Sequence, residues 1–260
     1  MESAILEVRN VRKALGAGAA RQTIIGDLTF SARPGEFLSV VGPSGCGKTT
    51  LLMCLAGLYD IDAGTVHFED QPIAAPPPGL SVVFQDYSRS LLPWKSNLDN
   101  VLFGMHRTTL DGPARRAHAL ELLQAVGLSG FEDHFPWQVS GGMQQRVAIA
   151  RGLAAQSRLL LLDEPLAAVD AQTRAELQDL LLDLARRFNQ TCVLVTHDVD
   201  EAVYMADRVI VLSRRPTSVV ADLAVALPKP RDQLETREHR TYLELRHEVL
   251  TMIRSMRQAA

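Results

Sequence analysis

Residues 42–49 read GPSGCGKT, and their types and spacing are those of a phosphate-binding loop. The glycines let backbone N–H groups approach phosphate oxygens closely, because no Cβ obstructs the approach. The Lys48 ammonium can reach terminal phosphates, and the Thr49 hydroxyl can bind Mg²⁺. A glycine-rich turn that matches by chance is the alternative. By itself the motif predicts a nucleoside triphosphate site and leaves the reaction open.

A second chemical group lies at residues 159–165, which read LLLLDEP. Four leucines in a row predict a strand covered on both faces, and Asp163 and Glu164 follow at its end. Asp163 can hold Mg²⁺ through water, and Glu164 can polarise water for in-line attack on a terminal phosphate. The alternative is an ordinary strand that ends in a solvated acidic turn. The phosphate loop in the same chain argues against that alternative.

A third motif, VSGGMQQR at residues 139–146, places Ser140 before Gly141 and Gly142. A serine and two glycines at the start of a predicted helix form a second helix N-terminus suited to anions. Taken alone, such a triplet is more often a plain helix cap. Its place shortly before residues 159–165 is what makes an anion site the better interpretation.

The spacing of apolar residues predicts the elements that position these motifs. Alternation and short apolar runs predict strands at residues 5–8, 24–30, 37–41, 65–68, 80–84, 159–162, 191–195 and 209–212. Helical spacing predicts helices at residues 47–58, 114–126, 141–155 and 173–188, and a last helix with Tyr242, Leu245, Val249, Met252 and Met256 on one stripe. Residues 15–20 predict a turn. Strands separated by helices imply a parallel sheet, whereas residues 96–156 predict a helical insert.

Composition narrows the class of protein. Of the 260 residues, 47% are hydrophobic and 22% charged, which is typical of a globular protein. The 27 Lys and Arg against 30 Asp and Glu leave a net charge of −3, which argues against a polycationic nucleic-acid binder. No signal peptide and no apolar run of roughly 20 residues is evident in the sequence. Three cysteines cannot all pair, so we expect reduced thiols and a cytosolic compartment.

Two further short motifs are Gln85 in VVFQD and His197 in LVTHD. Along the chain, the five motifs come in the order GPSGCGKT, Gln85, VSGGMQQR, LLLLDEP and His197. On these motifs, nearly the whole chain resembles the ATP-binding subunits of ATP-binding-cassette (ABC) transporters. The resemblance implies an α/β P-loop NTPase fold: a RecA-like core, an antiparallel β subdomain and an inserted α-helical subdomain. It predicts one ABC transporter domain over 1–226, with the nucleotide-binding core at 1–88 and 158–226, the helical signature subdomain at 89–157, and a tail and helix at 227–260.

The resemblance also implies a role for individual residues, with ATP and Mg²⁺ as cofactors. Gln85, Glu164 and His197 are expected to act in hydrolysis, and Thr49, Gln85 and Asp163 to surround the metal. The signature at Ser140 is expected to contact the γ-phosphate held by the opposite subunit of a head-to-tail homodimer, and Asp170 to cross the dimer seam. The expected nucleotide contacts are Gly42, Pro43, Ser44, Gly45, Cys46, Gly47, Lys48, Thr49, Thr50, Ser140, Gly141, Gly142 and Leu15.

Two of these positions lead to hypotheses of their own. The family usually has an aromatic residue shortly before the second strand, where adenine stacks, and Leu15 stands at that position. We therefore expect weak adenine selectivity, which an unchanged ATP affinity in Leu15→Tyr would contradict.

Cys46 lies at a helix start, where thiol pKa values tend to fall, so a maleimide should modify it and Mg-ATP should block the reaction. A small buried filler residue is the alternative for Cys46.

Residues 91–94 read LLPW, and with residues 213–232 they resemble the nitrate, sulfonate and taurine importer group. This resemblance implies a homodimer at the cytoplasmic face of the inner membrane, bound to membrane-spanning permease subunits and fed by an extracytoplasmic solute-binding protein. Trp94 is predicted to contact the permease, with local packing as the alternative. Other functions stay open: import of a thiamine-precursor pyrimidine, an exporter or lipoprotein-release ATPase, and a cassette ATPase acting on nucleic acid or ribosomes, which the mild acidity disfavours.

Overall fold

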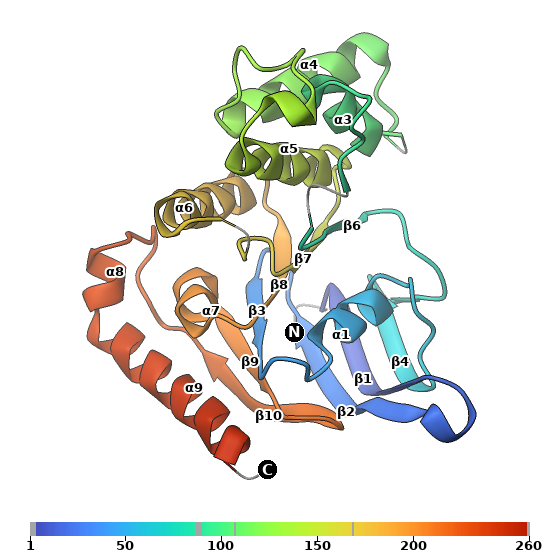
Figure 1. Ribbon diagram of the computed structural model, residues 1–260, viewed down its shortest axis with the longest axis vertical. Coiled ribbons are helices and arrows are strands. Elements are labelled where there is room, and N and C mark those ends of the chain that lie inside the picture. The colour runs from blue at the N-terminus through green and yellow to red at the C-terminus, as the bar shows by residue number, and fades with distance from the viewer. Residues whose placement is uncertain (1–3, 87–89, 107, 168, 259–260) are drawn as a thin grey trace. The chain divides into compact units, whose positions relative to one another are not determined.

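The computed structural model describes residues 4–86, 90–106, 108–167 and 169–258 (Figure 1). The chain divides into two compact units. The first unit is formed by Met1–Pro77 with Thr191–Ala260, and the second by Pro78–Gln190. The helical insert predicted at residues 89–157 falls within the second unit, whose described residues also include two strands and a further helix.

Half of the first unit's sheet is antiparallel and joins the other half through one shared strand that pairs on both sides. Its strands lie in the order β5-β4-β1-β2. Strand β10 then runs parallel to β2 and antiparallel to β9. The bounds are β1 (Leu6–Leu15), β2 (Gln22–Ala32), β4 (Ala63–Phe68), β5 (Gln71–Pro72), β9 (Arg208–Leu212) and β10 (Thr217–Ala224). This half matches the antiparallel β subdomain expected from the sequence.

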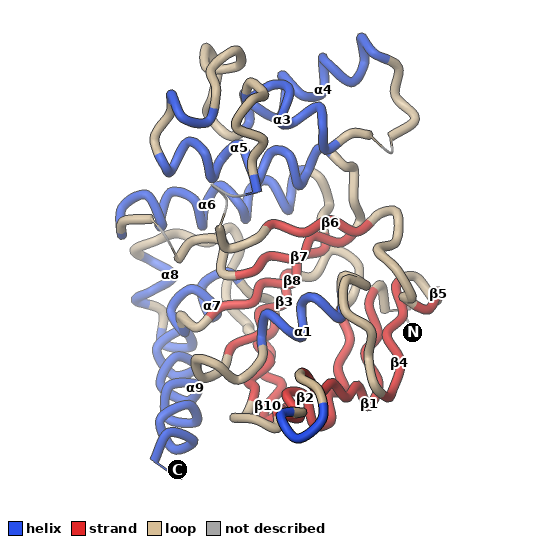
Figure 2. The backbone as a smooth tube through the Cα atoms, turned by 45° about the vertical axis from the view of Figure 1, so that its right-hand side comes forward, coloured by secondary structure: helices blue, strands red, loops and turns tan. Residues whose placement is uncertain are grey.

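The other half of that sheet is parallel and buried. Every residue of β3 (Phe37–Val41) and β8 (Thr191–Thr196) is buried, because α1 (Lys48–Leu55) and α7 (Val199–Met205) cover the two faces of the sheet (Figures 1 and 2). At the carboxyl ends, Val41 of β3 is level with Thr196 of β8 and with Val211 of β9. The segments that follow these three strands therefore leave the sheet along one edge, where α/β proteins bind ligands.

The second unit is mostly helical. Its two strands, β6 (Leu80–Val83) and β7 (Leu159–Asp163), are parallel and bring Val83 level with Leu162. Its helices are α3 (Asn97–Gly104), α4 (Gly112–Ala125), α5 (Gly141–Ala154) and α6 (Ala171–Arg187), and the first three pack on one another. Each helix begins where a short polar side chain accepts a hydrogen bond from a first-turn N–H: Ser96, Asp111, Ser140 and Asp170.

The structure differs from the sequence-based expectation in several elements. The predicted turn at residues 15–20 was placed one residue early, since β1 continues to Leu15 and a short 3₁₀ turn, Gly18–Ala20, follows. Helix α1 ends at Leu55 rather than at residue 58, and Gly57 adopts a φ of +68° that stops the helix. Strand β10 and the short helices α3 and α7 were not predicted.

The last helix, α9 (Arg240–Gln258), packs on α7 as its apolar stripe predicts. Tyr242 and Val249 of the stripe are buried, and Leu245 and Met252 are half-buried. The Tyr242 hydroxyl donates a hydrogen bond to Asp200 Oδ1 at 3.0 Å, and Arg246 forms an ion pair with the same carboxylate. Asp200 lies in α7, which follows His197 in the chain. These contacts therefore connect α9 to the helix that comes directly after the predicted site residue His197.

Candidate active site

The phosphate loop lies between β3 and α1 in the first unit. Gly45 has a φ of +75° and Gly47 a φ of +114°, conformations that side chains with a Cβ rarely adopt. Lys48 is only 5% exposed, and its Nζ donates hydrogen bonds to the carbonyl oxygens of Gly42 at 3.1 Å and Pro43 at 3.3 Å. A cation held inside a turn of backbone at the start of a helix fits a polyphosphate.

Neighbouring strands fix the shape of this loop. The Thr217 hydroxyl, in β10, donates a hydrogen bond to the Cys46 carbonyl and is 1% exposed. A Cβ on Gly47 would lie 2.5 Å from Cγ2 of Ile24 in β2, so both the space and the backbone angle require glycine there. The role of Thr217 could not be predicted from the sequence, because a threonine far along the chain carries no signal of its contact with the loop.

His197 stands at the same edge of the sheet as the phosphate loop. It directly follows β8, and the last residue of β8, Thr196, is level with Val41, which directly precedes the loop. His197 is exposed, and the next residue, Asp198, caps α7 by accepting hydrogen bonds from two backbone N–H groups. The first unit thus brings together the predicted phosphate loop and His197, the histidine predicted to act in hydrolysis.

In the second unit, the ends of β6 and β7 bring together the predicted hydrolytic pair. Gln85 follows β6, Glu164 follows β7, and Gln85 Nε2 donates a hydrogen bond to Glu164 Oε2 at 3.3 Å. Glu164 has a φ of +44°, which is uncommon for a residue with a side chain. Asp163 is 3% exposed and is the last residue of β7. The carboxylate, amide and hydroxyl oxygens of Asp163, Gln85 and Thr49 are of the kind that Mg²⁺ prefers.

The signature motif lines a separate cavity of about 540 Å³ in the second unit. Ser140 caps α5, and the neighbouring wall comes from Asp170 and Thr173 at the start of α6. Asp170 accepts hydrogen bonds from the backbone N–H and the hydroxyl of Thr173, and these bonds lower the pKa of its carboxyl. A Cβ on Gly142 would lie 3.1 Å from Cγ2 of Thr173, so the second glycine of the motif lets the two helix starts approach each other.

Cys46 departs from the expectation that its thiol is acidic. Burial raises the pKa of the Cys46 thiol, and the nearby charges of Lys48 and Arg215 oppose this effect only in part. The residue is 2% exposed. This burial agrees with the alternative interpretation of Cys46 as a small buried filler residue. The hypothesis that the Cys46 thiol has a low pKa was wrong, because the start of a helix does not compensate for the loss of solvation.

From this burial we expect a maleimide to modify Cys46 slowly in the folded protein at neutral pH. The reactive thiolate is scarce below the thiol pKa, so the rate should rise as the pH is raised. Mass spectrometry of the labelled peptide, with Cys46→Ser as the control, measures this rate. Rapid modification at neutral pH, at the rate of the unfolded chain, would contradict the burial of the thiol.

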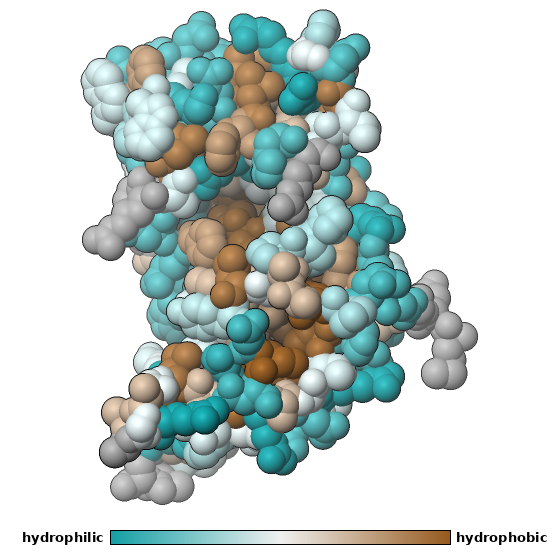
Figure 3. Space-filling view, turned by 90° about the vertical axis from the view of Figure 1, so that its right-hand side faces the viewer, coloured by the Kyte–Doolittle hydropathy of each residue, from teal (hydrophilic) through white to brown (hydrophobic). Residues whose placement is uncertain are grey.

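Leu15 and the last two residues of the LLPW segment, Pro93 and Trp94, are exposed, whereas Leu91 is buried. Leu15, the last residue of β1, is 37% exposed. Trp94 is 71% exposed, which rules out the alternative that it is locally packed. Apolar residues form separate patches on the face drawn in Figure 3, so exposure alone does not mark a contact surface.

The backbone around Trp94 is nevertheless firmly held. The Asn100 side chain is fully buried; its amide donates hydrogen bonds to the carbonyls of Leu92, Lys95 and Ser96, and its oxygen accepts one from Leu92 N–H. A held loop that presents an exposed tryptophan is suited to contact another protein. The role of Asn100 could not be predicted from the sequence, since asparagine is common in exposed turns as well.

The predicted site residues therefore fall into two sets. The first unit holds the phosphate loop and His197, and the second holds Gln85, Asp163, Glu164 and the signature. Comparison with known proteins identifies the combination: the ABC transporter family profile matches residues 25–167. The chain belongs to the ABC transporter family. The resemblance inferred from the five motifs is thus confirmed.

Two relatives place this cassette within the family. It is 42% identical over 250 residues to the nitrate import ATP-binding protein NrtC of Synechococcus elongatus, covering 93% of this chain and 37% of NrtC. It is 46% identical over 199 residues to the taurine import ATP-binding protein TauB of Yersinia pestis, covering 76% of this chain and 77% of TauB. The chain thus spans little more than a third of the length of NrtC and most of that of TauB.

A solved structure supports the fold assignment. The ATP-binding cassette MJ0796, in a dimeric post-hydrolysis state bound to ADP and Pi, is 32% identical and superposes with a TM-score of 0.74. The match covers 85% of this chain and 98% of the cassette. The fold expected from the sequence, a P-loop ABC ATPase, is confirmed. Among the residues that the structure describes, no helix is both long enough and apolar enough to cross a membrane.

Proposed function

We propose that this chain is the ATP-hydrolysing subunit of an ABC importer, and that it couples ATP binding and hydrolysis to the uptake of a small anionic solute such as nitrate, sulfonate or taurine. The observation that carries this proposal is the phosphate loop with its buried Lys48, level with His197 at one sheet edge. The import relatives favour uptake over export, and the LLPW segment favours the nitrate, sulfonate and taurine group.

The residues of the predicted site have side chains suited to ATP and Mg²⁺, and different residues bind the phosphates and the metal ion. Residues 42–50 bind the phosphates with backbone N–H groups and with Lys48, which neutralises their charge. Thr49 and Asp163 would supply hydroxyl and carboxylate oxygens for Mg²⁺, and the bound ion would neutralise phosphate charge.

Glu164 and its hydrogen-bond partner Gln85 then act on water. Glu164 orients a water molecule and accepts its proton, while Gln85 holds the carboxylate in position through the 3.3 Å contact. His197 donates a hydrogen bond to the γ-phosphate. The water oxygen forms a bond to phosphorus, the bond to the leaving oxygen breaks, and ADP and inorganic phosphate are the products.

We further propose that two copies act head to tail, so that the Ser140 signature of one copy completes the phosphate site of the other. Each helix start carries only a partial positive charge, which is too weak to hold ATP alone. Paired with a phosphate loop across a dimer, it would make ATP the link between the copies. The dimeric structure of the MJ0796 cassette supports this arrangement.

The partners follow from the same assignment. Permease subunits would bind the surface around Trp94, and an extracytoplasmic solute-binding protein would deliver the solute to them. This would place the chain at the cytoplasmic face of the inner membrane as a peripheral subunit. The solute does not touch this subunit, so its identity depends on the binding protein.

The permease contact is tested by a pair of tryptophan variants. Trp94→Ala is expected to weaken association with the co-purified membrane subunits by about tenfold or more, as loss of an aromatic anchor does. Trp137→Ala is the matched control, because Trp137 is equally exposed at 70% and is not expected to face the permease. Equal retention of the membrane subunits by Trp94→Ala and by the unaltered chain would contradict the proposed contact.

A further inference from the structure

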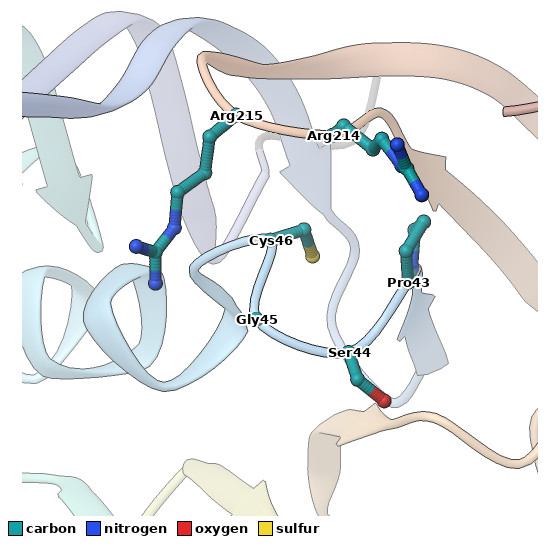
Figure 4. A pocket seen from close by; sticks show the side chains of 6 residues that line it. All are labelled: Pro43, Ser44, Gly45, Cys46, Arg214 and Arg215. Carbon is teal, nitrogen blue, oxygen red and sulfur yellow. The ribbon is translucent and has the colours of Figure 1, made fainter. Parts of the chain in front are cut away.

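A cavity of about 520 Å³ opens on the phosphate loop in the first unit (Figure 4). One wall consists of the loop itself, Pro43 to Cys46. The other wall consists of Arg214 and Arg215, from the turn between β9 and β10. In Figure 4 the two arginine side chains extend on either side of the loop, Arg214 toward Pro43 and Arg215 on the side of Cys46. None of the five motifs that place the chain in the family includes these arginines.

Two sets of contacts fix the backbone of this turn beside the loop. Ser213 N–H donates to the Ser218 carbonyl at 2.9 Å, and Ser218 N–H donates to the Ser213 hydroxyl at 2.9 Å, so the base of the turn is closed. Thr217, just after the arginines, is bonded to the Cys46 carbonyl. The place of both arginines relative to the phosphate loop is therefore built into the sheet and does not depend on a long flexible segment.

The charge of this cavity favours an anion. Its lining contains two guanidinium groups and no carboxylate. Among the residues that the structure describes, Arg215 makes no hydrogen bond and no ion pair, although most of the other arginines have such a partner. An arginine stays protonated at all accessible pH values, so Arg215 presents a permanent positive charge toward the loop. Its charge already acts on the Cys46 thiol, where it partly offsets the effect of burial on the pKa.

We propose that Arg215 is a further nucleotide-binding residue, which holds the phosphate chain of the nucleotide from the β9–β10 turn in addition to Lys48 from the loop. This inference rests on the proposed function, because it takes the ligand of the loop to be a nucleoside triphosphate. A guanidinium binds phosphate through its charge and its parallel N–H groups, so the contact depends on the phosphates and not on the base. It would thus add affinity at a site where Leu15 provides no aromatic ring for adenine.

The test measures the affinity of the full chain for Mg-ATP, Mg-GTP and AMP by equilibrium binding. Arg215→Gln is expected to weaken binding of both triphosphates by about fivefold, the upper end for an exposed charge pair, and to affect AMP less. The loss should shrink as the ionic strength is raised. Arg215→Lys, which keeps the charge, should retain most of the affinity. Arg9→Gln is the matched control, since Arg9 is an exposed arginine of the same unit on β1.

The outcomes separate this inference from the function on which it rests. Unchanged triphosphate affinity in Arg215→Gln, or a loss confined to ATP and absent for GTP, would overturn the role of Arg215 as a phosphate ligand. Lys48→Ala serves as the second arm. If Lys48→Ala removes triphosphate binding while Arg215→Gln leaves it unchanged, only the inference fails. If Lys48→Ala also leaves binding unchanged, the proposed phosphate site itself is wrong.

Discussion

Glu164→Gln is expected to lower the rate of ATP hydrolysis by about 10²- to 10³-fold and to leave ATP binding intact. An amide of the same shape can still accept the hydrogen bond from Gln85, but it cannot take a proton from water. ATP that is bound and not hydrolysed would keep linking the two copies. The variant should therefore accumulate as an ATP-bound dimer.

Steady-state hydrolysis and size-exclusion chromatography with and without Mg-ATP measure both effects. Glu121→Gln is the control, because Glu121 lies in the same unit and forms an exposed ion pair with Arg187 far from the strand ends. A Glu164→Gln protein that hydrolyses ATP at the normal rate and stays monomeric would refute the assignment of Glu164.

Ser140→Asp is expected to abolish ATP-driven dimerisation and to reduce hydrolysis to the level of an isolated copy. The carboxylate would place a negative charge where the signature is proposed to meet the γ-phosphate of the opposite copy. The helix itself should tolerate the change, because aspartate caps a helix about as well as serine and is favourable beside its positive end.

Ser140→Asn separates the charge from the loss of the hydroxyl. Asparagine also caps helices well, so both variants should unfold at similar denaturant concentrations. Dimerisation, followed by chromatography, should be lost in Ser140→Asp and largely kept in Ser140→Asn. Normal dimerisation in Ser140→Asp would mean that the signature does not face a phosphate.

The sequence predicted those helices and strands whose local pattern of apolar residues matches their burial in the folded protein. Strand β3, strand β8 and helix α5 lie close to their expected positions, because uninterrupted apolar runs and a serine cap leave few alternatives. Strand β10 was missed, since TSVVADLA mixes polar and apolar residues and is stabilised as a strand by its neighbours β2 and β9. The pairing with β2 spans a long sequence separation and leaves no local signal.

Site residues could be predicted from the sequence where the residue types and spacing of a short motif indicate a particular chemistry. The phosphate loop, Glu164 and the capping role of Ser140 follow from short patterns, whereas the role of Gln85 was implied by the family resemblance and its contact with Glu164 came from the structure. Thr217 could not be found in this way because it contacts a loop distant in sequence, and Arg215 because only the sheet determines the place of its turn. Asn100 contacts residues only four to eight positions earlier, but asparagine is common in exposed turns as well. The error at Cys46 has a similar origin, since burial of the thiol is a property of the packed loop and not of the motif.

The central claim is that each ATP is held between two copies of this chain and that one copy alone hydrolyses it poorly. The most direct test is the rate of hydrolysis per molecule of protein, measured over a wide range of protein concentration. The account predicts that this rate falls steeply on dilution, as copies separate, and that Ser140→Asp stays at the low level throughout. A rate per molecule that is constant down to extreme dilution, and equal in Ser140→Asp, would contradict it.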